Sequence, residues 1–277
     1  MKWRNLRRSS NVDDFRGGGG LPVRGGGLGL GGIILVLVGS WIFGVNPLTV
    51  LSVLEGGSQL APPPQQRSSI SDERSDFVRA VLGDLEDVWQ QELLPGRFRP
   101  ARLVLFSNST QSACGYASSA VGPFYCPANQ QVYLDLSFFR DLQQRYQAGG
   151  DFAEAYVIAH EVGHHVQNLL GTSSSVRRQQ ARLNKAQSNQ LSVRLELQAD
   201  CYAGLWGHYA RRRNLLEAGD LQEALKTAAE IGDDRLQKRS QGYVVPESFT
   251  HGTAQQRMFW FKKGFDSGQL SSCDTFV

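Results

Sequence analysis

Two histidines that lie four residues apart flank a glutamate in the string His-Glu-Val-Gly-His, which runs from His160 to His164. On a helix this spacing places both imidazoles on one face, where two ring nitrogens can reach one tetrahedral zinc ion. Glu161 lies beside the first histidine and can take a proton from a zinc-bound water, whose pKa zinc lowers to about 7. The pattern therefore predicts hydrolysis of a peptide bond, although so short a string also arises by chance.

A catalytic zinc ion usually has three protein ligands, so a third donor is required. We expect this donor to be Glu196, in the segment Leu-Glu-Leu-Gln-Ala-Asp-Cys. Asp200 lies four residues later on the same helical face and can accept a hydrogen bond from the far nitrogen of a ligand histidine. The alternative is that both are ordinary surface carboxylates, which the many apolar residues around them make less attractive.

Further histidines and one arginine are weaker candidates. His251, in a loop before a helix, could donate to the oxyanion that develops during attack on a carbonyl, with Arg257 as a helper or as a structural anchor. His165 points about 100° away from His164 on a helix and is expected to bond elsewhere. His208 could support the site but is more often structural in such a position.

The elements that must position these residues are mostly helical. Apolar periodicity predicts helices over 71–89, 138–146, 152–170, 193–213, 221–238 and 254–265, with a polar helical excursion over 173–194. Strands are predicted over 102–106 and 131–136. The second could pair with an extended substrate as an edge strand or be an ordinary internal strand.

The start of the chain differs in composition from the rest. Residues 1–27 are basic and Gly-rich and are predicted to be a disordered cytoplasmic tail. Residues 28–54 carry no charge and are long enough for a transmembrane anchor; a cleaved signal peptide and a buried core helix are the alternatives. Residues 55–70 read as a Pro/Gln/Ser tether, and 71–277 as the zinc metallopeptidase domain.

All four cysteines follow the apolar segment, which favours disulfides in a domain outside the cytoplasm. Cys114 and Cys126 enclose a short loop and are expected to form a local bridge. Cys201 could then pair with Cys273, or could remain a buried thiol. The net charge of +3 gives no reason to expect nucleic-acid binding.

Longer strings around these residues resemble the neutral zinc metallopeptidase family of bacterial membranes. The resemblance covers most of the chain and is far more specific than the zinc motif alone. It implies a gluzincin-type site, with a glutamate on a second helix as third ligand. The matching strings are Met1–Arg4, Asn11–Asp14, Ala113–Gly115, Gly122–Pro127, Val132–Asp135, His160–Gln167, Glu196–Gly204 and His251–Arg257.

We therefore expect an α+β, zincin-like, helix-dominated domain after a single N-terminal transmembrane helix. It would hold one Zn²⁺ per chain and cleave a peptide or protein substrate outside the cytoplasm, anchored in the bacterial inner membrane with its N-terminus cytoplasmic. One rival is a membrane-tethered scaffold with a structural zinc. Another is a zinc hydrolase acting on a non-peptide amide of the cell wall.

Overall fold

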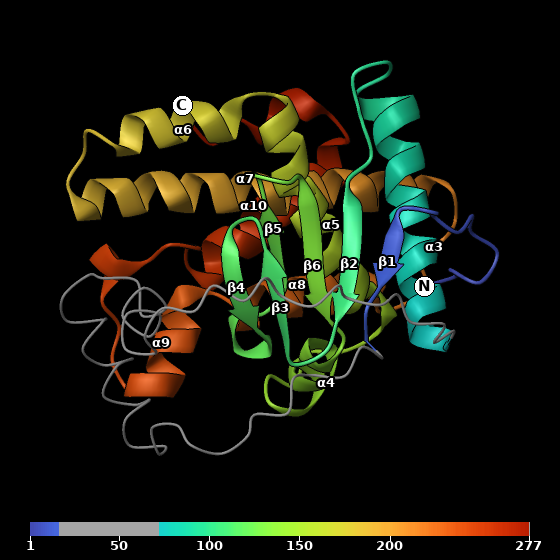
Figure 1. The fold of residues 1–277 in the computed structure, drawn as a ribbon, viewed down its shortest axis with the longest axis horizontal. Coiled ribbons are helices and arrows are strands. Elements are labelled where there is room, and N and C mark those ends of the chain that lie inside the picture. Colours follow the sequence, from blue (N-terminus) through green and yellow to red (C-terminus); the bar gives the residue numbers. More distant parts are fainter. Residues whose placement is uncertain (17–71, 277) are drawn as a thin grey trace, which may run out of the picture.

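The computed structural model describes residues 1–16 and 72–276. In Figure 1 a small sheet lies in front of a set of helices, with α3 (Glu73–Val88) along one flank and α4 (Ser137–Gln144) at one end of the strands. This is the expected α+β, helix-dominated class. Helix α3 starts at 73 because the Asp72 carboxylate accepts the Ser75 backbone N–H at 2.7 Å, and the Ser75 hydroxyl accepts the Asp72 backbone N–H in return.

The main sheet has four strands in the order β1 (Val12–Asp14), β2 (Arg102–Phe106), β6 (Gln131–Asp135) and β5 (Phe124–Cys126). The first three are parallel, and β5 is antiparallel to β6 at the edge. The predicted strand over 131–136 is therefore internal. Among the described residues β5, for which the sequence predicted no strand, is one edge of the sheet, and β1 is the other. A separate hairpin joins β3 (Ser109–Ser112) to β4 (Gly115–Ser118).

Successive side chains of β2 point to opposite faces of the sheet, where they enter two different apolar clusters. Leu103 and Leu105 of β2 belong to the large core shared with the helices. Val104 and Phe106 face the other way and form a small second cluster with Tyr133. The helices therefore cover one face of the sheet and leave the other to a thin apolar layer.

The first 16 residues are part of this folded body, so the prediction of a disordered tail over 1–27 is wrong for residues 1–16; residues 17–27 lie outside the described residues. Val12 pairs with Leu103, so β1 extends the main sheet. The Trp3 ring is buried against Phe77 of α3 at a centroid distance of 5.3 Å, and its indole N–H donates to the Asp151 carboxylate at 3.2 Å.

The basic residues near the start are used within the fold. The Arg7 guanidinium donates to the Glu86 carboxylate at 2.8 Å, and Arg8 donates to Asp76 at 2.8 Å, both on α3. Their acidic partners lie 79 and 68 positions later in the chain. Because these partners are so distant in sequence, the local excess of positive charge suggested an unpaired basic flank.

This pairing bears on the predicted membrane topology. A single crossing by residues 28–54 would place β1 and β2 on opposite sides of a bilayer, which is incompatible with their hydrogen-bonded register. The single-pass arrangement with a cytoplasmic N-terminus therefore disagrees with the fold. The predicted anchor (28–54) and tether (55–70) lie outside the described residues. Within the two described ranges, no helix combines the length and apolar character needed to cross a membrane.

Two helices carry the candidate metal ligands, and they pack closely. They are α5 (Asp151–Leu169) and α7 (Lys185–Arg212). A Cβ added to Gly163 of α5 would lie 3.1 Å from the backbone of Ala199 on α7, so only glycine fits there without displacement. Gly163 therefore permits the close approach of α5 and α7.

The opposite side of α7 is closed by α10 (Ala254–Ser267). A Cβ on Gly204 would come within 2.0 Å of the Phe261 carbonyl oxygen, and one on Gly264 within 2.0 Å of the Cys201 carbonyl oxygen. Gly204 therefore serves the contact between α7 and α10. This three-helix stack fixes α7 from both sides.

The helix boundaries differ from the predicted ones at two places. The helix expected from 193 begins at 185, because the Asn184 side chain accepts the Gln187 backbone N–H at 3.0 Å as part of a capping box. Together with α6 (Thr172–Gln180) it forms the polar hairpin expected over 173–194. The helix expected over 221–238 is divided into α8 (Asp220–Glu230) and α9 (Asp233–Gln241), with a break at Gly232, which packs on Ala254.

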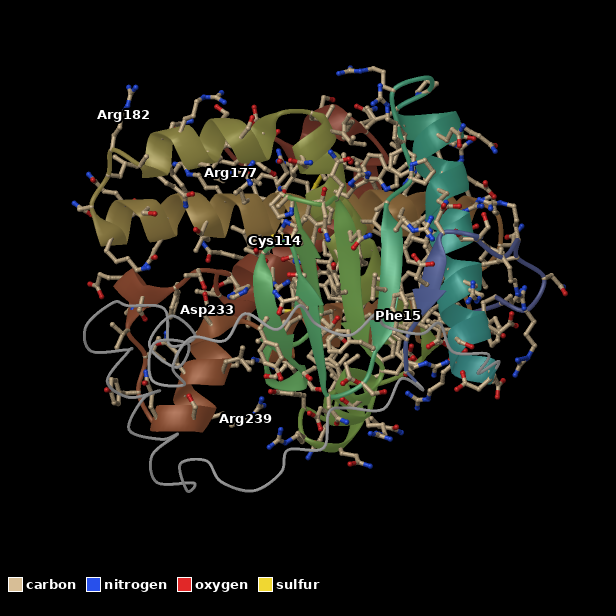
Figure 2. The ribbon with its side chains drawn as sticks, viewed as in Figure 1. Phe15, Cys114, Arg177, Arg182, Asp233 and Arg239 are labelled. Carbon is tan, nitrogen blue, oxygen red and sulfur yellow. A yellow bond between two sulfur atoms is a disulfide. The ribbon has the colours of Figure 1, made fainter. Side chains whose placement is uncertain are left out.

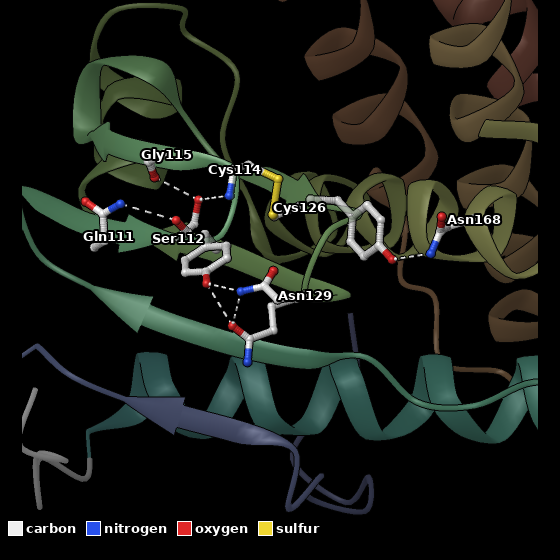
Figure 3. The surroundings of a disulfide bond; sticks show 10 residues. Gln111, Ser112, Cys114, Gly115, Cys126, Asn129 and Asn168 are labelled. Atoms are coloured by element: carbon white, nitrogen blue, oxygen red, sulfur yellow. Dashed lines mark hydrogen bonds between the residues drawn. A yellow bond between two sulfur atoms is a disulfide. The ribbon is translucent and has the colours of Figure 1, made fainter. Parts of the chain in front are cut away.

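Both predicted disulfides are present. Cys201 of α7 is bonded to Cys273, with a Cα–Cα distance of 5.6 Å. Cys114 is bonded to Cys126, which ties the β3–β4 hairpin to the end of the edge strand β5. The Ser112 hydroxyl accepts the Cys114 backbone N–H beside this bridge (Figure 3). The β5 edge of the sheet is thereby held at one end by a covalent bond.

Candidate metal centre

The three predicted ligands converge between α5 and α7. The Nε2 atom of His160 lies 3.1 Å from one carboxylate oxygen of Glu196, and the Nε2 atom of His164 lies 3.3 Å from the other. One ligand atom from each residue falls within 4.8 Å of the others. The helical spacing and the close contact at Gly163 therefore bring all three side chains to one point.

These separations fit a zinc ion. Ligand atoms about 2.0 to 2.1 Å from a tetrahedral zinc stand about 3.4 Å apart, close to the distances between Glu196 and the two histidines. Two imidazole nitrogens and one carboxylate oxygen are also donors that zinc accepts in catalytic sites. The group lies on the wall of a cleft with a volume of about 630 Å³, so a fourth position would face open space.

Glu161 lies beside the ligands on the same cleft wall and is 8% exposed. Burial raises the pKa of its carboxyl, and the imidazoles of His164 and His160 oppose that rise. A carboxylate taken out of water holds a proton more readily, which suits a general base. The structure thus places an acid–base group next to the ligand set, where the motif predicts it.

Behind the ligands, Asp200 is fully buried and orients the first histidine. Its carboxylate lies 2.8 Å from Nδ1 of His160. It also accepts the Tyr156 hydroxyl at 2.5 Å and two guanidinium N–H groups of Arg257, each at 2.9 Å. Although burial opposes ionisation, Arg257 and His160 hold the pKa of Asp200 at about 2. An ionised Asp200 fixes the tautomer that leaves Nε2 of His160 free to bind a metal.

Of the two roles predicted for Arg257, a helper of His251 or a structural anchor, this network fits the structural anchor. Its guanidinium is buried and also donates to the Ile231 carbonyl oxygen at 3.2 Å and to the Tyr156 hydroxyl at 3.2 Å. With these bonds in place, it anchors the carboxylate that holds His160. Tyr156 was missed in the sequence analysis, although its position four residues before His160 puts it on the same helical face.

His251 reaches the cleft from the loop before α10, and its side chain is 50% exposed. Asp233 at the start of α9 holds this loop, since its carboxylate accepts the backbone N–H groups of Thr250, His251 and Gly252 at 2.6 to 3.0 Å. Its other oxygen lies 3.3 Å from Nδ1 of His251. Burial lowers the pKa of His251, but the negative charges of Glu196 and Asp233 outweigh this effect and raise the pKa above its usual range.

Asp233 is a further residue that the sequence did not reveal. It lies 18 positions before His251 and in a different element, so no spacing rule connects the two. Its three backbone contacts are formed only when the ends of α9 and α10 are brought together by the fold. The raised pKa of His251 favours the protonated form of the imidazole at the cleft.

The other two histidines lie outside the centre. Nε2 of His165 is 2.6 Å from the Arg99 carbonyl oxygen, and its Nδ1 is 3.0 Å from the Tyr125 hydroxyl. Nδ1 of His208 is 2.9 Å from the Phe265 carbonyl oxygen. Both are structural, as the sequence analysis favoured.

A family model described as "putative neutral zinc metallopeptidase" matches residues 1–276 of this chain. The chain belongs to this family. The resemblance found in the sequence is thereby confirmed, and the family description names the class that the convergent side chains fit.

Relatives in the neutral zinc metallopeptidase family match most of the chain. "Uncharacterized protein YpfJ" of Escherichia coli K12 is 47% identical over 288 residues, covering 100% of this chain and 99% of the relative. "Uncharacterized protein Rv2575" of Mycobacterium tuberculosis H37Rv is 44% identical over 252 residues, covering 85% and 84% of the two chains. No solved structure matches the chain.

The network around Asp200 generates a prediction about metal affinity. Replacing Asp200 by Asn removes the charge that orients His160, and we expect zinc to bind about 10- to 100-fold more weakly. The unfolding free energy should also fall by about 3 to 5 kcal/mol, because Arg257 is left without a buried counter-charge. Zinc affinity is measured by competition with a chelator, and stability by thermal melting.

The matched control is Tyr156→Phe, which removes one hydrogen bond to the same carboxylate and keeps the charge. We expect it to cost about 1 kcal/mol of stability and to weaken zinc binding less than Asp200→Asn. Unchanged zinc affinity in a folded Asp200→Asn protein would show that this residue does not position the ligand.

Proposed function

We propose that this protein is a zinc-dependent peptidase that hydrolyses peptide bonds of a peptide or protein substrate. The observation that carries the proposal is the open set of three donors, His160, His164 and Glu196, with Glu161 beside it on the wall of a large cleft. Bound zinc would act as a Lewis acid on the scissile carbonyl and would make a water molecule acidic near neutral pH.

The residues of the chain then have distinct tasks. Glu161 accepts a proton from the attacking water as the oxygen bonds to the carbonyl carbon. It returns that proton to the amide nitrogen, so that the C–N bond breaks and the amine leaves neutral. His251 donates a hydrogen bond to the oxyanion that forms in between, held in place by Asp233.

The edge strand β5 supports a peptide as the substrate. Its residues Phe124 and Tyr125 line the same cleft as the ligands, and its outer side has no strand neighbour within the described residues. An extended peptide can add to such an edge through backbone hydrogen bonds, while its side chains enter the cleft. A non-peptide amide would have no use for this edge.

A purely structural zinc is less well supported. A structural site is normally closed by four protein ligands. Among the described residues the metal-binding group contains three, and all four cysteines are consumed in disulfides. The open fourth position favours catalysis.

We also propose that the folded domain works outside the cytoplasm and is attached to the membrane through residues 28–54, with both ends of that segment on the side of the domain. The two disulfides are typical of an oxidising compartment. The β1–β2 pairing requires residues 1–16 and 72–276 to share one side. Cell fractionation combined with thiol alkylation tests this. We expect a membrane-associated protein with no reactive thiol before reduction, and four reactive thiols in a soluble protein would contradict it.

Replacing Glu161 by Gln tests the mechanism. The variant should keep its zinc, because the three ligands are untouched, and should lose at least about 100- to 10,000-fold in turnover, because no base remains to take the proton. Turnover is followed with a fluorescently labelled unfolded protein, with and without a chelator, and zinc content by elemental analysis.

Glu154→Gln is the matched control. Glu154 lies on the same helix α5 but does not line the cleft. We expect it to cleave as wild type does. A Glu161→Gln protein that also cleaved at the wild-type rate would refute the assigned role, and a wild type that held zinc without cleaving any substrate would favour a scaffold.

A further inference from the structure

The charged groups that line the cleft are nearly all matched within the fold. Arg257 is paired with Asp200, as described above. Arg145 lies 3.5 Å from the carboxylate of Asp141, on the helix α4. Apart from tyrosines, the remaining ionisable groups on the cleft wall are His160, Glu161, His164, Arg177, Glu196 and His251.

Glu196 lies against both His160 and His164, and these two imidazoles also act electrostatically on Glu161. His251 is held by Asp233. Arg177 is the exception. It lies in the last turn of α6 with an exposed side chain, and among the described residues its guanidinium has neither an ion pair nor a side-chain hydrogen bond. The cleft therefore carries one unneutralised positive charge.

The position of this charge is close to the edge strand. Arg177 and Tyr125 line the same cleft. Burial raises the pKa of the Tyr125 hydroxyl to about 12, and the positive charge of Arg177 opposes that rise. Tyr125 belongs to β5, and its hydroxyl accepts a hydrogen bond from Asn168 near the end of α5 (Figure 3). Arg177 thus stands over the part of the cleft where β5 and the end of α5 meet.

An arginine in the last turn of a helix can also serve the helix itself, by facing the negative end of the helix dipole. Arg178 occupies the same turn and would serve equally well in that role. It does not line the cleft, whereas Arg177 does. Arg182, farther out on the α6–α7 hairpin, projects away from the sheet (Figure 2). A helix-dipole role therefore does not explain why one arginine of the hairpin faces the cleft.

We propose that Arg177 forms a substrate subsite for a carboxylate, supplied either by an acidic side chain or by the free C-terminus of a peptide. The proposal rests on the proposed peptidase function and specifies its substrate class. A guanidinium binds a carboxylate through two parallel hydrogen bonds, and the partly enclosed cleft wall screens this contact less than open water does. Peptides without a carboxylate at that position would leave Arg177 unpaired.

The test measures binding, so that it does not depend on turnover. The Glu161→Gln protein, zinc-loaded and immobilised, is exposed to a pool of synthetic octapeptides with randomised positions, half with free and half with amidated C-termini. Retained peptides are eluted and sequenced by mass spectrometry. The same is done with Glu161→Gln/Arg177→Gln and with the matched control Glu161→Gln/Arg178→Gln.

We expect Glu or Asp to be enriched about tenfold over Gln or Asn at one fixed position, or free C-termini to be enriched over amides to the same extent. The first result identifies a side-chain subsite, and the second a C-terminal one. The enrichment should vanish with Arg177→Gln, persist with Arg178→Gln, and fall as ionic strength rises. In Arg177→Glu it should shift to Lys and Arg.

Retention of peptides without any preference for a carboxylate would overturn the proposal, as would a preference that survives Arg177→Gln or no retention at all. Failure of the peptidase function is a separate result. If wild type cleaves none of the retained peptides while the carboxylate preference depends on Arg177, the subsite stands as a binding site and the hydrolytic mechanism falls.

Discussion

The close contact between α5 and α7 is the constraint on which the site depends. Gly163 has no side chain, so the backbone of Ala199 can approach to contact distance. One turn before Ala199, Glu196 is thereby brought within hydrogen-bonding distance of both His160 and His164. A side chain at 163 would force the two helices to give by a few tenths of an ångström, which is about the tolerance of metal–ligand distances.

The remainder of the fold maintains that contact. Glycines on α7 and α10 let these helices meet backbone to backbone, and the disulfide from Cys201 to Cys273 closes the same side covalently. From α10, Arg257 reaches through to Asp200, so the packing of three helices is coupled to the orientation of one imidazole. The N-terminal strand β1 completes the sheet at the edge opposite β5, and Trp3 is buried against α3.

Much of the centre could be predicted from sequence because its residues follow helical spacing. His160, Glu161 and His164 share one helix, and Glu196 and Asp200 share another, so a period of 3.6 is enough to group them. Asp233 could not be found this way, since its partner His251 lies in another element and the contact arises only from the fold. The N-terminal segment was misjudged for the same reason: its arginines find their carboxylates on α3, far along the chain. The edge strand β5 was not predicted at all, because it has only three residues and no alternating pattern.

We propose that His160, His164 and Glu196 form an open, three-ligand zinc site. Crystallography of the zinc-loaded protein, with data collected on both sides of the zinc absorption edge, would locate the metal directly. We expect one anomalous peak per chain, about 2.0 to 2.2 Å from a nitrogen of His160, a nitrogen of His164 and a carboxylate oxygen of Glu196, with no fourth side chain bound. A peak elsewhere, no peak, or a site closed by a fourth side chain would contradict it.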